Sequence, residues 1–195
     1  MLKRLLLAAV LLSTGPLAHA QKEKEAPAVL PIDADTKLIT YTGVMEVPDA
    51  PKNELYARGK VFFANTFKSA QNVIQADDKE AGLLIGKGWE QTYVTIMLIP
   101  APEKLWYTVR LSFKDGKYRY SISDFKFEGE PSKYNYHPTP YEAEKYMQAK
   151  KDGTPTGNAA KFGKALDDAA RAMVASIQST MSKPAAGGAA GSKDW

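Results

Sequence analysis

The 195-residue sequence contains no cysteine and only two histidines. The absence of cysteine excludes disulfides, thiolate metal sites and a lipid anchor on a thiol. His19 lies in a segment that we expect to be removed, so His137 is the only imidazole of the predicted mature chain. A catalytic zinc site normally uses two or three imidazoles. We therefore predict no metal site and no cofactor.

Long hydrophobic runs are also scarce, and the N-terminal one is short. Residues 5–12 are apolar, but a bilayer-spanning helix needs about 20 such residues. The run follows Lys3 and Arg4 and precedes Ala18-His19-Ala20, an arrangement typical of a secretory signal peptide. Cleavage after Ala20 predicts a periplasmic or extracellular protein with no transmembrane segment.

An excess of charge of one sign is almost absent. The formal net charge of +4 falls to +2 when Lys3 and Arg4 leave with the signal. The remaining basic residues are interleaved with Asp and Glu, which is typical of a solvated surface rather than of a phosphate-binding stripe. We do not expect a nucleic-acid partner.

Removal of the first 20 of 195 residues leaves 175, a length that suits one domain. We divide the chain into a signal peptide (1–20), a flexible leader (21–36), a single α+β domain (37–181) and a disordered tail (182–195). The leader has no sustained hydrophobic period, and the tail is rich in alanine and glycine.

The first half of the domain predicts a strand, a helix and a hairpin. Alternating residues over 39–47 indicate a half-buried strand. Asn53 is a candidate N-cap for a helix with an aromatic face, in which Gly59 indicates close approach to a neighbouring element. The hairpin that follows has a charged turn ending at Gly82, and Gly86 and Gly88 indicate a distortion of its second strand.

The second half predicts further strands and a long helix. Residues 92–99 and 105–113 are β-prone, and prolines end the first of these runs. Asp115-Gly116 predicts a type I′ hairpin turn, and a change of parity near Ser123 and Asp124 predicts a β-bulge. The connection 128–157 is long and contains a short helix predicted to run from Thr139-Pro140 to about Lys151.

The last element is an amphipathic helix whose apolar stripe must cover the sheet. The stripe consists of Phe162, Leu166, Ala170, Met173, Ile177 and Met181. The whole pattern predicts an α+β fold: a curved antiparallel sheet of about five strands, with the N-terminal helix and the long C-terminal helix packed on one face.

One stretch carries a family resemblance. Residues 53–88 include Phe62-Phe63, Phe67-Lys68-Ser69-Ala70, Asp77-Asp78-Lys79-Glu80-Ala81-Gly82 and Leu84-Ile85-Gly86-Lys87-Gly88. This stretch resembles the bacterial family of domains of unknown function numbered 4468, described as having a TATA-binding-protein-like fold. The resemblance covers roughly residues 39–127 and implies a secreted or periplasmic protein with an antiparallel sheet and packed helices. The predicted architecture is thus TBP-like or helix-grip-like. It implies no activity and no catalytic residue.

Several motifs fail as functional sites. The segment Gly82–Gly88 is not a phosphate loop, because three residues instead of four separate its first two glycines. No Gly-x-Ser-x-Gly elbow accompanies His137, and Asp77, Asp78 and Glu80 lack the spacing of a calcium-binding loop. We predict no catalytic residue.

The candidate ligand-binding residues face away from the predicted core. They are Trp89, Trp106, Thr108, Arg110 and Arg119. On a concave sheet face, aromatic and cationic groups suit an apolar acid or a glycan. The alternative is an ordinary solvated outer face.

Three functions remain open from the sequence. The first is a non-enzymatic binding module for an unknown small amphipathic molecule or an envelope protein, with a cleft between sheet and last helix and 128–157 as its lid. The second is a structural or protein-interaction module with a fully packed core. The third is a carboxylate-based hydrolase, which clustered buried carboxylates would favour.

Overall fold

The computed structural model describes residues 28–67, 69–96, 98–133, 135–147 and 156–183. The predicted signal peptide, residues 21–27 of the leader and residues 184–195 of the tail lie outside this part. Within it, no helix is long and apolar enough to cross a bilayer.

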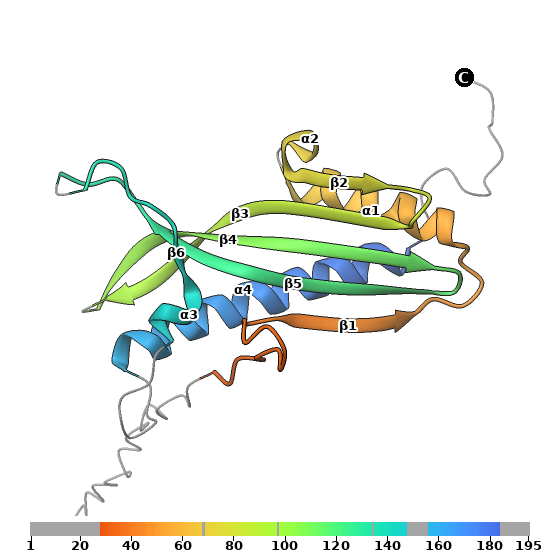
Figure 1. Cartoon of the computed structure of the whole chain (residues 1–195). Coiled ribbons are helices and arrows are strands. Elements are labelled where there is room, and N and C mark those ends of the chain that lie inside the picture. The colour runs from red at the N-terminus through yellow and green to blue at the C-terminus, as the bar shows by residue number, and fades with distance from the viewer. Residues whose placement is uncertain (1–27, 68, 97, 134, 148–155, 184–195) are drawn as a thin grey trace, which may run out of the picture.

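A six-stranded antiparallel sheet forms the centre of the fold (Figure 1). Its strands are β1 (Tyr41–Glu46), β2 (Ile74–Asp78), β3 (Leu83–Ile96), β4 (Ile99–Lys114), β5 (Lys117–Gly129) and β6 (Tyr141–Glu142). They are ordered β1-β5-β4-β3-β2, and β6 pairs with β5. The helices are α1 (Lys52–Thr66), α2 (Ala70–Val73), α3 (Ala143–Tyr146) and α4 (Gly157–Met181). Both long helices, α1 and α4, lie on the same face, which confirms the predicted α+β class.

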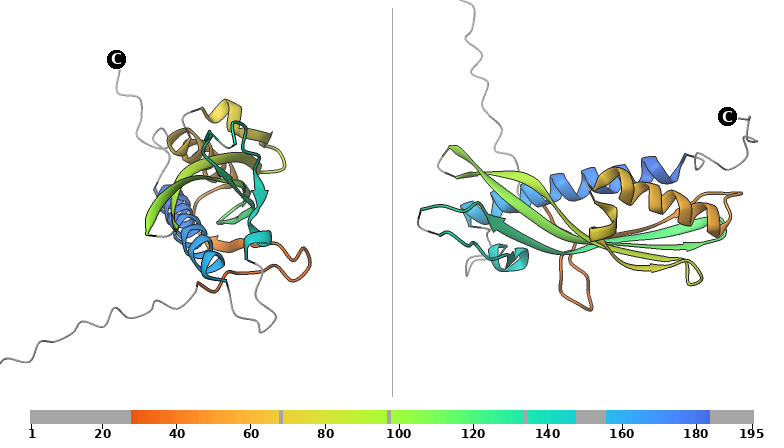
Figure 2. Two further views of the ribbon diagram at one scale, coloured as in Figure 1. Left: turned by 90° about the vertical axis from the view of Figure 1, so that its left-hand side faces the viewer. Right: turned by 90° about the horizontal axis from the view of Figure 1, so that it is seen from above.

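The sheet curves around α4 (Figure 2). This helix contacts β3 and also β1, which lies at an edge of the sheet with two strands in between. All six apolar stripe residues predicted for α4 are buried, with exposed fractions of 0–6%. The side chains of the stripe therefore fill the centre of the space in which we expected a cleft. An open hollow of about 450 Å³ remains at the edge, between Met45 and Val47 on the β1 side and Gln178 and Ser179 of α4.

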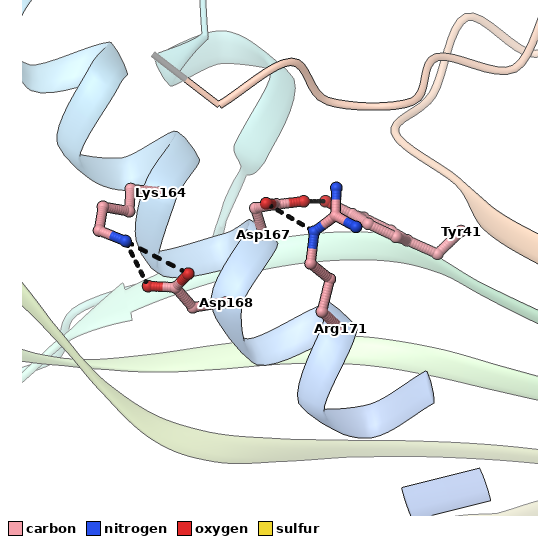
Figure 3. A network of polar contacts seen from close by, with 5 residues as sticks. All are labelled: Tyr41, Lys164, Asp167, Asp168 and Arg171. Carbon is pink, nitrogen blue, oxygen red and sulfur yellow. Dashed lines mark hydrogen bonds and ion pairs between the residues drawn. The ribbon is translucent and has the colours of Figure 1, made fainter. Parts of the chain in front are cut away.

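A polar network fixes β1 to α4 (Figure 3). The hydroxyl of the buried Tyr41 donates to Oδ1 of Asp167 at 2.7 Å, and Nε of Arg171 donates to Oδ2 at 2.8 Å. Burial opposes ionisation of Asp167, but the hydrogen bonds from Arg171 and Tyr41 hold its pKa below the ordinary value. Lys164 pairs with Asp168 one turn away, at 3.1 Å.

Strands β3 and β4 are longer than we predicted from the sequence. The hairpin strand after Gly82 and the run 92–99 are mostly one continuous strand, β3, and Pro100 and Pro102 lie inside β4. A proline removes one backbone donor and is tolerated where a strand is paired on one side only. Both prolines satisfy this condition, because the pairing of β4 with β5 begins only at Glu103 and Gly129.

The glycines of β3 receive the phenylalanines of α1. A Cβ atom at Gly86 would overlap the ring of Phe63, and a Cβ atom at Gly88 would overlap that of Phe67, just after the helix. The β3–β4 register is unbroken through both glycines, so the predicted distortion of β3 is wrong; the irregularity lies in β2, between Ile74 and Ala76. Close approach at Gly59 is confirmed, because its missing Cβ makes room for Phe113 and Leu84.

The turn between β4 and β5 also supports α1. Oδ1 of Asp115 accepts a hydrogen bond from the backbone N–H of Lys52 at 2.7 Å, at the start of the helix. The N-cap position is Pro51, so the predicted cap at Asn53 is wrong. The predicted type I′ turn is also wrong, because Gly116 has a positive φ of 72° and Asp115 does not.

Two connecting segments contain local structure. In the described part of the leader, Ile32 bridges to Ile39, and a turn hydrogen-bonded by Asp33 lies between them. The helix predicted to begin at Thr139-Pro140 is the four-residue α3, with Glu142 at its N-cap position. Residues 148–155, through which we expected it to continue, lie outside the described part.

We predict that Gly86→Ala lowers the free energy of unfolding by about 1–3 kcal/mol, because the new methyl group overpacks the contact with Phe63. Urea denaturation measures this change. Gly157→Ala is the matched control, since its Cβ meets no atom within 4 Å. Partial recovery in the double variant Gly86→Ala/Phe63→Leu is expected, and equal stability of Gly86→Ala and Gly157→Ala would contradict the interlock.

Candidate functional site on the open face of the sheet

The face of the sheet opposite α1 and α4 carries all five predicted ligand-binding residues. Strand β4 alternates buried core residues with more exposed ones, and Trp106, Thr108 and Arg110 have the exposed parity. Trp89, on β3, pairs with Trp106 of β4. Arg119, on β5, pairs with Ser112 of β4. Because the sheet curves around α4, this open face is on the outside of the curve. The expectation of a concave face is therefore wrong.

The two tryptophans form one end of the open face. Their ring centroids are 6.1 Å apart, and Trp89 remains 45% exposed. The indole N–H of Trp106 donates to Oε2 of Glu128 at 2.8 Å, and Lys104 pairs with Glu128 at 3.0 Å. The Lys104 ammonium also lies 5.4 Å from the centroid of a Trp89 ring. These polar groups are already satisfied, so this end offers a ligand mainly the exposed surface of Trp89.

Thr108 belongs to a separate ionic cluster around Asp124. Its hydroxyl lies 3.3 Å from Oδ2 of Asp124, and Lys87 and Lys126 pair with the same carboxylate at 3.1 and 3.7 Å. Asp124 has a positive φ of 59° where the β4–β5 register shifts between Trp106 and Thr108. The predicted bulge is confirmed, and it brings Asp124 against Thr108. Thr108 thus has a partner within the protein.

Arg110 and Arg119 are both exposed, and among the residues that the structure describes no acidic side chain pairs with either of them. Arg110 is directly opposite Ser121, and Ser112 is directly opposite Arg119. The arginines are therefore diagonal neighbours, about 7–8 Å apart at their Cα atoms. Two guanidinium groups at this spacing, flanked by two hydroxyls, can together bind one anionic group.

The surface is hollowed at the arginine pair. A hollow of about 320 Å³ is lined by Arg110, Ser112, Arg119 and Ser121, with Tyr120. An adjoining hollow of about 390 Å³ shares Ser112 and Arg119 and includes the exposed Val44. Lys114 and Lys117 also line it. The combined groove thus places apolar surface beside unpaired positive charge. Both volumes are within the range of small-molecule sites.

Sequence reasoning missed the serines of this groove. Lys114 pairs with Lys117 across the turn, and this pair fixes the residues that lie opposite one another further along β4 and β5. Counting outward from the predicted turn at Asp115-Gly116 along both strands would therefore have found both Arg–Ser pairs. The ion pairs of Asp124 and Glu128 had no comparable signal, since they depend on the bulge and on side-chain conformation.

The other face of the sheet holds two carboxylates that bear on the hydrolase alternative. Glu103 is 8% exposed, and burial raises its pKa, against a hydrogen bond with Tyr141 that lowers it. Burial also raises the pKa of Glu90. One oxygen of each has no hydrogen-bond partner among the described residues. They are diagonal neighbours, since Glu90 pairs with Leu105 and Glu103 with Thr92. No hollow described here opens onto them, so we assign them no chemistry.

The architecture as a whole is that of an α+β domain with one helix-covered and one bare sheet face. Residues 41–128 match the family model described as a domain of unknown function (DUF4468) with TBP-like fold. This match confirms the resemblance found in residues 53–88. No curated protein matches the sequence.

Two solved structures support the same fold. A DUF4468 family protein from Bacteroides ovatus is 16% identical with a TM-score of 0.63, covering 80% of this chain and 92% of that one. A TBP-like protein from Parabacteroides distasonis is 14% identical with a TM-score of 0.62, covering 80% of this chain and 98% of that one. At these identities the similarity establishes the fold and no activity.

We predict that Glu103→Gln removes part of the pH dependence of stability. A carboxyl whose pKa is raised on folding binds more protons in the folded state, so the wild type loses stability as pH rises from 4.5 through the raised value. The neutral amide has no such loss, and thermal unfolding from pH 4 to pH 8 measures the difference. Glu46→Gln, an exposed carboxylate on β1, is the control. Parallel profiles for wild type and Glu103→Gln would contradict the burial effect.

Proposed function

We propose that this protein is a non-enzymatic, secreted or periplasmic binding module for a small amphipathic anion. The ligand lies on the open face of the sheet, with its anionic group between Arg110 and Arg119. Its apolar part lies along the groove past Val44. One observation carries the proposal: Arg110 and Arg119, each opposite a serine, line the same hollow and have no acidic partner among the described residues.

Charge pairing on the open face supports this choice of site. Lys87, Lys104 and Lys126 each have an acidic partner within the protein. The guanidinium groups have none among the described residues, although Glu and Asp are common in the sequence. An anion that binds both arginines would gain charge-assisted hydrogen bonds without breaking an existing ion pair. The hydroxyls of Ser112 and Ser121 beside them add further hydrogen-bond donors.

The location rests on the predicted signal peptide. Its basic start, apolar run and small-x-small site lie in residues 1–20, outside the described part. A periplasmic or extracellular setting offers anions of two kinds, the amphipathic fatty acids and the wholly polar acidic glycans. We assign no catalytic residue.

A protein-interaction module is the second candidate, and the packed interior favours it. The stripe of α4 is buried along its whole length, so the protein has no need of a ligand to complete its core. Binding of a small molecule at the arginine pair separates the two candidates.

The test is calorimetric titration of the mature chain from Gln21 with dodecanoate and with an oligogalacturonate, an amphipathic carboxylate and an acidic glycan. We predict that at least one binds, and that Arg110→Ala/Arg119→Ala weakens its binding by at least about tenfold, because each charge-assisted hydrogen bond contributes about 1.5–3 kcal/mol.

The matched control is Lys145→Ala/Lys161→Ala, which removes two exposed positive charges from α3 and α4. It is expected to bind as the wild type does. If both double variants lost the same amount of binding affinity, net charge alone would account for binding and the proposed site would be wrong. Failure of the wild type to bind either probe, together with a clean apo mass in native mass spectrometry of protein purified from its own envelope, would favour the protein-interaction candidate.

A further inference from the structure

The end of the β3–β4 hairpin is an exposed apolar projection. Beyond the rung of Glu103 and Gly129, β4 has no partner in β5, and only the four rungs from Tyr93–Pro102 to Ile96–Ile99 continue. Leu98 is 94% exposed, Ile99 is 68% exposed and Tyr93 is 62% exposed. Figures 1 and 2 show this end of the two strands beside the N-terminal end of α4. One side of the hairpin end is covered, since Val94 is buried and Ile96 packs against the core, and the exposed residues lie at its tip and on its other side.

The projection carries no charge. No Asp, Glu, Lys or Arg occurs from Gln91 to Pro102, between Glu90 and Glu103. At about 3.3 Å per residue, this makes the last 15 Å or so of the hairpin uncharged. Large exposed apolar groups gathered in this way mark an interaction surface in a water-soluble protein.

The order of the side chains along the hairpin resembles that of a membrane interface. The aliphatic Leu98 and Ile99 are at its end, and Tyr93 is three rungs further back, opposite Pro102. The first basic residue, Lys104, comes only after these. Tyrosine favours the boundary between headgroups and acyl chains, with aliphatic residues deeper and charged residues outside.

The size of the projection argues against a protein partner. A stable protein interface buries about 800 Å² on each side and uses about 20–30 residues. The described part of the hairpin end offers only nine residues, 93–96 and 98–102. A lipid surface needs no complementary shape, so a narrow tip can insert into it.

We propose that the end of the β3–β4 hairpin docks this protein on a lipid bilayer, with Leu98 and Ile99 inserted. Insertion is shallow, about 5–10 Å, because the outer backbone groups of both strands are unpaired there and must stay in contact with water or headgroups. Binding is weak and reversible, on the order of the 10⁴ M⁻¹ of one myristoyl chain or below. It is insensitive to salt, since no charge takes part. The proposal is independent of the ligand site at Arg110 and Arg119.

The absence of cysteine allows a direct test. In the mature chain, Leu98→Cys at the hairpin end and Lys183→Cys just after α4 each accept one environment-sensitive fluorophore at an exposed position. With neutral phosphatidylcholine vesicles, we expect a blue shift of the label at position 98 that saturates with lipid and persists at high salt. The label at position 183 is expected to stay in water. Equal shifts at both positions, or none at position 98, would overturn the proposal.

A second pair of variants measures the contribution of the side chains. Leu98→Asp/Ile99→Asp is expected to lower vesicle partitioning in a sedimentation assay by about tenfold or more. Val29→Asp/Val61→Asp removes two exposed aliphatic groups elsewhere and adds the same charge, and it is expected to partition as the wild type does. If the wild type instead self-associates without lipid and Leu98→Asp/Ile99→Asp abolishes this, the hairpin end is an interface between copies of the chain and the membrane proposal fails.

Discussion

The rings of Phe63 and Phe67 occupy the space that side chains at Gly86 and Gly88 would fill. This interlock lets α1 approach β3 closely, and Phe113 against Gly59 does the same for β4. The side chains on the helix-covered face of the sheet pack against α1, and the apolar stripe of α4 completes the core. Open hollows remain beside α1 and beside the C-terminal part of α4, as well as on the opposite face. We place the proposed ligand on the opposite face because the arginine pair lines the hollow there.

The open face is divided by its own electrostatics. Carboxylates satisfy the polar groups at its tryptophan end and around the bulge, since Glu128 binds Trp106 and Lys104, and Asp124 binds Lys87. The same face leaves Arg110 and Arg119 without acidic partners among the described residues. Two exposed arginines without acidic partners are tolerated, because water solvates their guanidinium groups. An anion that replaces this water would form charge-assisted hydrogen bonds with both. The distribution of acidic partners therefore distinguishes the proposed binding groove from the rest of the polar face.

Much of this fold could be predicted from local patterns. The alternation over 105–113, the stripe of the last helix and the bulge at Asp124 each depend on neighbours close in sequence, and each is confirmed. The errors come from tertiary contacts: Asp115 caps α1 from a distant turn, and Pro100 and Pro102 are tolerated in β4 because its other neighbour has ended. Of the five predicted site residues, parity placed all on one face, but it could not show that Trp106 and Thr108 already have partners.

The central claim is that a ligand binds the open face and not the space beneath α4. An amide ¹H–¹⁵N chemical-shift map of the mature protein, titrated with dodecanoate below its micelle concentration, tests it most directly. The account predicts saturable shifts that centre on Arg110, Ser112, Arg119 and Ser121 and leave the buried stripe of α4 unmoved. Shifts that centre on Leu166, Met173 and Ile177 would mean that the helix opens to admit the ligand, and would contradict the account.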